Sequence, residues 1–109
     1  QVSEGMALAS GAKTSMAEYY NTEGSWATDN ASYGLATAAD IGNNYVSQVD
    51  AGTVPGRIQV TYSGPNVNNT ISGDILELSA TTSAGAIDWT CGSGGTTLAN
   101  QYLPSTCRQ

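Results

Sequence analysis

The sequence contains no histidine, and cysteine occurs only at Cys91 and Cys107. Without histidine, a Ser–His pair, a Cys–His pair and a histidine-ligated metal site cannot be built. Two carboxylates could still carry out acid–base catalysis, and Glu77 and Asp88 are the candidates. Both fall on the outward face of the strands expected below, so we interpret them as solvated surface charges. We therefore predict that the protein is not an enzyme.

Positive charge is also scarce. Lys13, Arg57 and Arg108 are the only cations, and the formal net charge is -6. A basic surface for nucleic acid or anionic lipid is missing, so DNA binding is expected to be weak or incidental. The scattered aspartates match no calcium-binding loop; no cofactor is predicted, and a bound calcium ion stays open as an alternative. These aspartates are Asp29, Asp40, Asp50 and Asp74.

Long apolar runs are absent as well. No window reaches the roughly 18 apolar residues that a membrane span needs, and no segment has the charged and apolar regions of a signal peptide. A chain of 109 residues supports one domain with one modest core. We expect a single soluble domain over residues 1–109.

The two cysteines bracket a glycine-rich loop near the C-terminus. Their number and spacing exclude a redox CxxC motif and a zinc cluster, and they indicate an oxidised pair from a periplasmic or extracellular setting. A bridge between Cys91 and Cys107 would contribute about 3 kcal/mol for a loop of this size. The enclosed segment from Gly92 to Thr97 has few long side chains, which leaves main-chain groups open to solvent. We interpret the loop first as a covalent staple and second as a recognition surface.

The first twenty residues have helical periodicity. Gly5 and Gly11 cost only about 1 kcal/mol each, so we predict a helix over 1–20. Its apolar face is expected to contain Val2, Met6, Leu8, Ala9, Ala12, Met16, Tyr19 and Tyr20. The helix begins without an N-cap or capping box, which we interpret as the cut end of a longer helix.

Residues 21–44 predict a long loop, because the helical pattern gives way to small polar residues. Its apolar anchors are Trp26, Tyr33, Leu35 and Ile41, and a short helix around Tyr33 to Asp40 stays open. Loops of this length usually serve binding or subunit contacts. Asn30-Ala31-Ser32 and, further on, Asn68-Asn69-Thr70 fit the N-glycosylation pattern, which often occurs by chance.

Four short runs follow in which the apolar residues recur at every second position, as in β-strands. Turn-forming residues at 51–56, 64–66 and 83–85 separate them. The runs are Tyr45 to Asp50, Arg57 to Ser63, Asp74 to Thr81 and Ala86 to Cys91. The positions expected to share a face are Ile58, Val60 and Tyr62, then Leu76, Leu78 and Ala80, then Ile87, Trp89 and Cys91. We predict an α+β fold in which the N-terminal helix packs across a four-stranded antiparallel sheet.

Four phrases of the sequence, taken in order, resemble a type IVa pilin of Gram-negative bacteria. They are the helix phrase from Ser3 to Thr14, Asn44-Tyr45-Val46, Trp89-Thr90-Cys91 and Tyr102-Leu103-Pro104-Ser105-Thr106-Cys107. The resemblance spans the whole chain and implies the major subunit of a retractile surface fibre. It implies a spine helix at 1–20, an αβ-loop at 21–44, a sheet at 45–91 and a disulfide-bounded D-region at 91–107.

The resemblance also implies partners and a location. They are other pilin subunits, the pilus assembly machinery and host cell-surface glycans, in a fibre that serves adhesion, twitching motility and, as an open alternative, DNA uptake. Family members carry a methylated first residue and an apolar helical half that anchors the precursor in the inner membrane; this sequence lacks both. Membrane contact is expected only through that missing helix.

In related pilins with this type of D-region, exposed main-chain groups bind glycans. The candidate receptor-binding residues by position are Gly92, Ser93, Gly94, Gly95, Thr96, Thr97, Tyr102 and Pro104. Two other classes stay open: a secreted carbohydrate-binding module, which would account for the aromatic content and the stapled loop, and a pseudopilin of a secretion system. The pilus subunit is preferred over the module because it also accounts for the cut helix, and over the pseudopilin because of the C-terminal cysteine pair.

Overall fold

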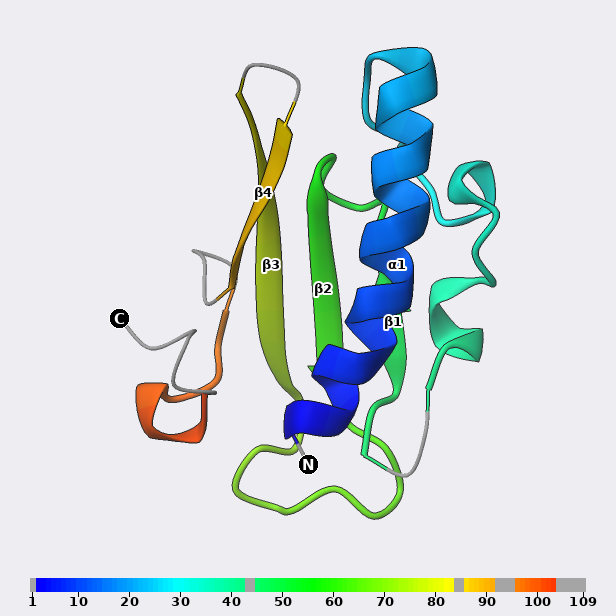
Figure 1. The fold of residues 1–109 in the computed structure, drawn as a ribbon. Helices are drawn as coiled ribbons and strands as arrows, with labels where there is room; N and C mark the ends of the chain where they lie inside the picture. Colours follow the sequence, from blue (N-terminus) through cyan, green and yellow to red (C-terminus); the bar gives the residue numbers. More distant parts are fainter. Residues whose placement is uncertain (1, 43–44, 84–85, 92–95, 104–109) are drawn as a thin grey trace.

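The computed structural model describes residues 2–42, 45–83, 86–91 and 96–103. One long helix, α1 (Val2–Glu23), packs on one face of a four-stranded antiparallel sheet (Figure 1). The strands are β1 (Gln48–Asp50), β2 (Arg57–Tyr62), β3 (Asp74–Ser83) and β4 (Ala86–Cys91), and they lie in this order across the sheet. The predicted α+β architecture is confirmed.

Small side chains on α1 let the helix approach the sheet closely. Its buried stripe consists of Gly5, Ala9, Ala12 and Met16, with the larger side chains at the edges of this stripe only partly buried. A Cβ atom on Gly5 would overlap the hydroxyl and ring of Tyr62 on β2. The helix therefore packs mainly on β2, and Tyr62 fills the space that Gly5 leaves.

The helix continues three residues beyond the predicted end. It stops at Gly24, whose φ of 76° is the left-handed conformation that glycine adopts at helix ends, and the Gly24 N–H donates to the Tyr20 carbonyl (2.8 Å). Tyr20 also stacks on Trp26, with ring centroids 4.4 Å apart, so the chain folds back directly after the turn.

The strands confirm the predicted period of two. Ile58, Val60 and Tyr62 are fully buried, and the register places Ile58 opposite Leu78 and Val60 opposite Leu76, so β2 and β3 supply the centre of the core. On β4 the inward positions are only half-buried, because α1 lies over β2 and leaves β4 partly uncovered (Figure 1). β1 is shorter than predicted, at three residues.

The loop between α1 and β1 contains two 3-10 turns, η1 (Ala31–Tyr33) and η2 (Ala38–Asp40), in place of one short helix. Tyr33 fixes the first turn. Its hydroxyl accepts from the Ala27 N–H (2.8 Å) and donates to the Ala27 carbonyl (3.3 Å), and its ring meets Tyr19 edge to face.

Asn30 fixes the same loop to β1. Its amide donates to the carbonyls of Ala36 (3.1 Å) and Val49 (3.0 Å) and accepts from the Ala51 N–H (2.8 Å). Asn30 is buried, so the glycosylation pattern at this position has no accessible acceptor. Asn68, in the second pattern, is exposed, and its side chain accepts from the Thr70 N–H (2.9 Å).

Candidate functional site

The candidate site is the C-terminal segment that runs beside β3. β4 begins its pairing with β3 at Leu78, so the half of β3 from Asp74 to Glu77 has no β4 partner on that edge. Residues 96–98 lie there instead: the N–H groups of Thr97 (2.8 Å) and Leu98 (3.3 Å) both donate to the Ile75 carbonyl. The segment thus continues the sheet edge beyond the end of β4.

Two threonine hydroxyls complete this edge. Thr97 Oγ1 accepts from the Ile75 N–H (2.8 Å), and Thr96 Oγ1 accepts from the Glu77 N–H (3.0 Å). An unpaired strand edge exposes a row of backbone donors and acceptors, and here side chains occupy the donors. Thr96 and Thr97 were predicted as receptor-binding residues; in the structure their side chains hold the segment on the sheet.

Tyr102 remains exposed at the end of this segment, within the 3-10 turn η3 (Asn100–Tyr102). Leu98 and Leu103 on either side of the turn are buried, which fixes it against the core. Among the described residues Tyr102 is the one large hydrophobic residue that is exposed, at 37%. The segment therefore has a fixed backbone with an outward aromatic ring.

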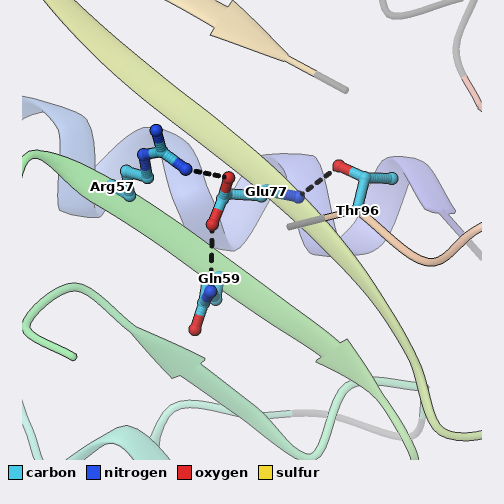
Figure 2. A network of polar contacts seen from close by, with 4 residues as sticks. All are labelled: Arg57, Gln59, Glu77 and Thr96. Carbon is cyan, nitrogen blue, oxygen red and sulfur yellow. Dashed lines mark hydrogen bonds and ion pairs between the residues drawn. The ribbon is translucent and has the colours of Figure 1, made fainter. Parts of the chain in front are cut away.

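Glu77 was predicted to be a solvated surface charge, and this prediction is wrong. Its side chain is 1% exposed and accepts from Arg57 Nη1 and from Gln59 Nε2, each at 2.9 Å (Figure 2). Both partners come from the neighbouring strand β2, and Thr96 bonds the Glu77 backbone from the other side. The outward position is covered by side chains, and the carboxylate belongs to a polar network on the outer face of the sheet. Asp88 is exposed, as predicted.

Several predicted site residues lie outside the described residues. They are Gly92, Ser93, Gly94, Gly95, Pro104 and Cys107. Cys91 ends β4 and is half-buried. The bridge between Cys91 and Cys107 and the receptor role of the loop therefore stay predictions.

Two aspartates stabilise turns. The Asp29 carboxylate accepts from the Ser32 N–H (2.7 Å), and its hydrogen bonds with Ser32 lower the pKa of Asp29 below 3.8. Burial alone would raise the pKa of Asp50, but the Thr53 hydroxyl (2.6 Å) and the N–H groups of Gly52 and Thr53 together hold it below 3.8. Within the described parts of the chain, no group of three possible ligands could hold a metal ion.

The comparisons with known proteins agree with one another. A family model described as pilin (bacterial filament) matches residues 1–108. The chain is 34% identical to a fimbrial protein of Neisseria meningitidis serogroup A and 35% identical to the type IV major pilin protein PilE of Neisseria gonorrhoeae. Each of these matches covers 99% of this chain and 74% of the relative. A fimbrial protein of Eikenella corrodens, EcpC, is 36% identical, over 99% of this chain and 69% of that protein. In the described ranges, no helix has the length and apolar character to cross a membrane.

Proposed function

The chain belongs to the type IV pilins and is a structural pilus subunit, not an enzyme, and we propose that the fibre it forms is retractile and serves adhesion and twitching motility. As a pilin it polymerises with other pilin subunits into a fibre at the cell surface. We further propose that the assembly machinery takes the subunit from the inner membrane, where an apolar N-terminal helix holds it before assembly.

The proposal of a major subunit is favoured over both alternatives. The family match extends over residues 1–108, which a carbohydrate-binding module would not account for, and relatives at 34 to 36% identity are named as fimbrial or major pilin proteins. The identity of these relatives favours a major pilin over a secretion-system pseudopilin. The net charge of -6 disfavours binding to the DNA backbone, so it gives no support for a role in DNA uptake.

The observation that carries the adhesion proposal is the exposed Tyr102 on a segment with a fixed backbone. Buried Leu98 and Leu103 and the hydrogen bonds to Ile75 hold this segment before any ligand arrives. A binding surface that is ordered in advance loses less conformational entropy when it binds. An aromatic ring presented in this way can stack on the apolar face of a sugar ring, so we propose that Tyr102 and nearby main-chain groups contact host glycans.

The test separates piliation from adhesion. In the bacterium that encodes the full-length subunit, we expect Tyr102→Ala to leave the amount of sheared fibre unchanged and to lower glycan binding by roughly tenfold, the loss of about 1.4 kcal/mol of contact. Gln101→Ala, at the neighbouring exposed position, is the matched control and should change neither quantity.

A second variant tests the fixed backbone. Thr96→Val with Thr97→Val removes both hydroxyls that accept from β3 while it keeps the shape of the side chains. We expect this variant to lose glycan binding as well. Normal binding by both variants on intact fibres would remove the C-terminal segment from adhesion, and the loop between α1 and β1 would become the next candidate.

A further inference from the structure

α1 has a groove along the flank that faces β4, with a volume of about 420 Å³. It is lined by Met6, Lys13, Leu78, Trp89, Thr90 and Cys91. The groove exists because α1 packs on β2 and leaves the inward face of β4 half-covered (Figure 1). Its walls combine apolar side chains with polar groups, and Lys13 supplies one positive charge.

Lys13 stands out by its lack of an acidic partner. The described part of the chain contains two cations, and Arg57 is paired with Glu77, whereas no ion pair is found there for Lys13. A half-buried Trp89 lies in the same groove, and tryptophan is enriched among the residues that dominate the binding energy of protein interfaces. The groove therefore fits an occupant that combines apolar surface with negative charge.

The opposite flank of α1 has the complementary character. A second groove of about 250 Å³ lies between α1 and η1, and it contains Glu18, Tyr19 and Glu23. Both glutamates are exposed, and so are Asp29 and Asp40 in the loop between α1 and β1. This loop runs along the same side of the helix (Figure 1). At about 100° per residue, Lys13 and Glu18 point about 140° apart around α1, so they cannot meet within one molecule.

We propose that the Lys13 groove of one subunit receives the Glu18 flank of a second copy of this chain. This inference rests on the assignment of the chain as a fibre subunit and identifies a lateral contact within the fibre. Because the two surfaces differ, each subunit uses its Lys13 groove toward one neighbour and its Glu18 flank toward another. Such a heterologous contact extends into a helical filament when the rotation between neighbouring subunits does not close a ring.

The experiment reverses charges in the full-length subunit and measures sheared fibre relative to total subunit in the cell. We expect Lys13→Glu alone, and Glu18→Lys alone, to lower the fibre yield about tenfold, because each places like charges across the contact. Combining Lys13→Glu with Glu18→Lys restores opposite charges, and we expect it to recover most of the yield.

Two controls make the result specific. Lys13→Gln and Asn69→Asp change the net charge equally, but Asn69 is exposed between β2 and β3 and is absent from both grooves. Lys13→Gln should lower the yield and make it less sensitive to salt, because the charge pair that salt screens is gone, while Asn69→Asp should leave both unchanged. Cellular subunit level and protease resistance establish that each variant is folded.

The outcomes separate this inference from the function on which it rests. Fibres at the wild-type level from Lys13→Glu, equal losses from Asn69→Asp, or a double variant that assembles no better than the single variants would each overturn the Lys13 contact while the fibre assignment stands. If the wild-type chain itself were absent from the fibres, the fibre assignment would fail first.

Discussion

At the scale of single residues, the polar network around Glu77 shows how a strand position that points away from the core can still be buried. The carboxylate has a guanidinium and an amide as partners from β2, so its charge is compensated (Figure 2). Removing one partner from a buried ion pair leaves an uncompensated charge, which costs more than the pair itself contributes. This asymmetry leads to the first prediction.

We expect Arg57→Met to lower the free energy of unfolding by about 2 kcal/mol, less than for a fully buried pair because 42% of the Arg57 side chain is exposed. Arg57→Met with Glu77→Gln removes both charges and should recover part of the loss. Urea unfolding monitored by tryptophan fluorescence measures both variants. An unchanged midpoint for Arg57→Met would mean that solvent already screens Glu77.

The second prediction concerns acid stability and Asp50. Its pKa is lower in the folded chain than the ordinary value of 3.8, so the ionised carboxylate stabilises the fold above about pH 4. This stabilisation is lost as the pH falls through the folded-state pKa. We expect the free energy of unfolding of Asp50→Asn to be about 1 kcal/mol lower than that of the wild type at pH 7. As the pH falls below about 4, this free energy should decrease less in Asp50→Asn than in the wild type.

Thermal unfolding across this pH range checks the Asp50 prediction. Asp88→Asn, which changes an exposed carboxylate on β4, is the control and should leave the pH profile close to that of the wild type. Parallel acid profiles for Asp50→Asn and the wild type would contradict the prediction.

At the scale of elements, α1 contains two glycines whose replacement by alanine should have opposite effects on stability. A Cβ atom at Gly5 would overlap Tyr62, whereas nothing lies within 4 Å of a Cβ atom at Gly11. We expect Gly5→Ala to destabilise the protein by about 1–3 kcal/mol through overpacking, and Gly11→Ala to stabilise it by about 0.5–1 kcal/mol through helix propensity. Paired thermal melts decide between these signs. A Gly5→Ala variant as stable as the wild type would show that the contact between α1 and β2 relaxes, and a destabilised Gly11→Ala variant would contradict the propensity argument.

The loop between α1 and β1 depends on Asn30. Replacing Asn30 with Ala leaves the Ala51 N–H and the Val49 carbonyl without this partner, and we expect a loss of about 2–3 kcal/mol. Asn68→Ala, in an exposed turn, is the control and should cost less than about 1 kcal/mol. Hydrogen exchange at Ala51 gives a local measurement, and unaltered protection in Asn30→Ala would contradict this account of the loop.

The sequence predicts the elements well because each element follows from a local period. The alternation of Ile58, Val60 and Tyr62 is a property of β2 alone, and it is enough to identify the buried face. Burial of Glu77 depends on side chains that are 18 to 20 residues away on β2, and Asn30 bonds residues 19 and 21 positions away. Such partners follow from the tertiary arrangement, which no local pattern contains.

The candidate site, like the fold, has features that follow from the local sequence and features that depend on the tertiary arrangement. Glycine content and the position of the cysteines point to the C-terminal segment, whose receptor role stays a prediction. The roles of Thr96 and Thr97 were not predictable, because they depend on where β4 ends relative to β3. The grooves on the two flanks of α1 were also missed, since they arise from the placement of the helix over β2.

At the scale of the whole molecule, the predicted Cys91–Cys107 bridge would tie the end of the chain to the sheet. We expect the mass of the protein to rise by two hydrogens on reduction and the free energy of unfolding to fall by about 3 kcal/mol. A variant with both cysteines replaced by Ser should be insensitive to reductant. Two free thiols in protein prepared under oxidising conditions would contradict the pairing.

The threonine hydroxyls beside β3 have a consequence for a protein that polymerises into a fibre. Open strand edges recruit strands from other molecules, and this templating leads to amyloid-like aggregation. The N–H groups of Ile75 and Glu77 are already occupied by Thr97 and Thr96. This half of the β3 edge therefore cannot nucleate such a stack. One pathway of aggregation that would compete with ordered polymerisation is thus closed.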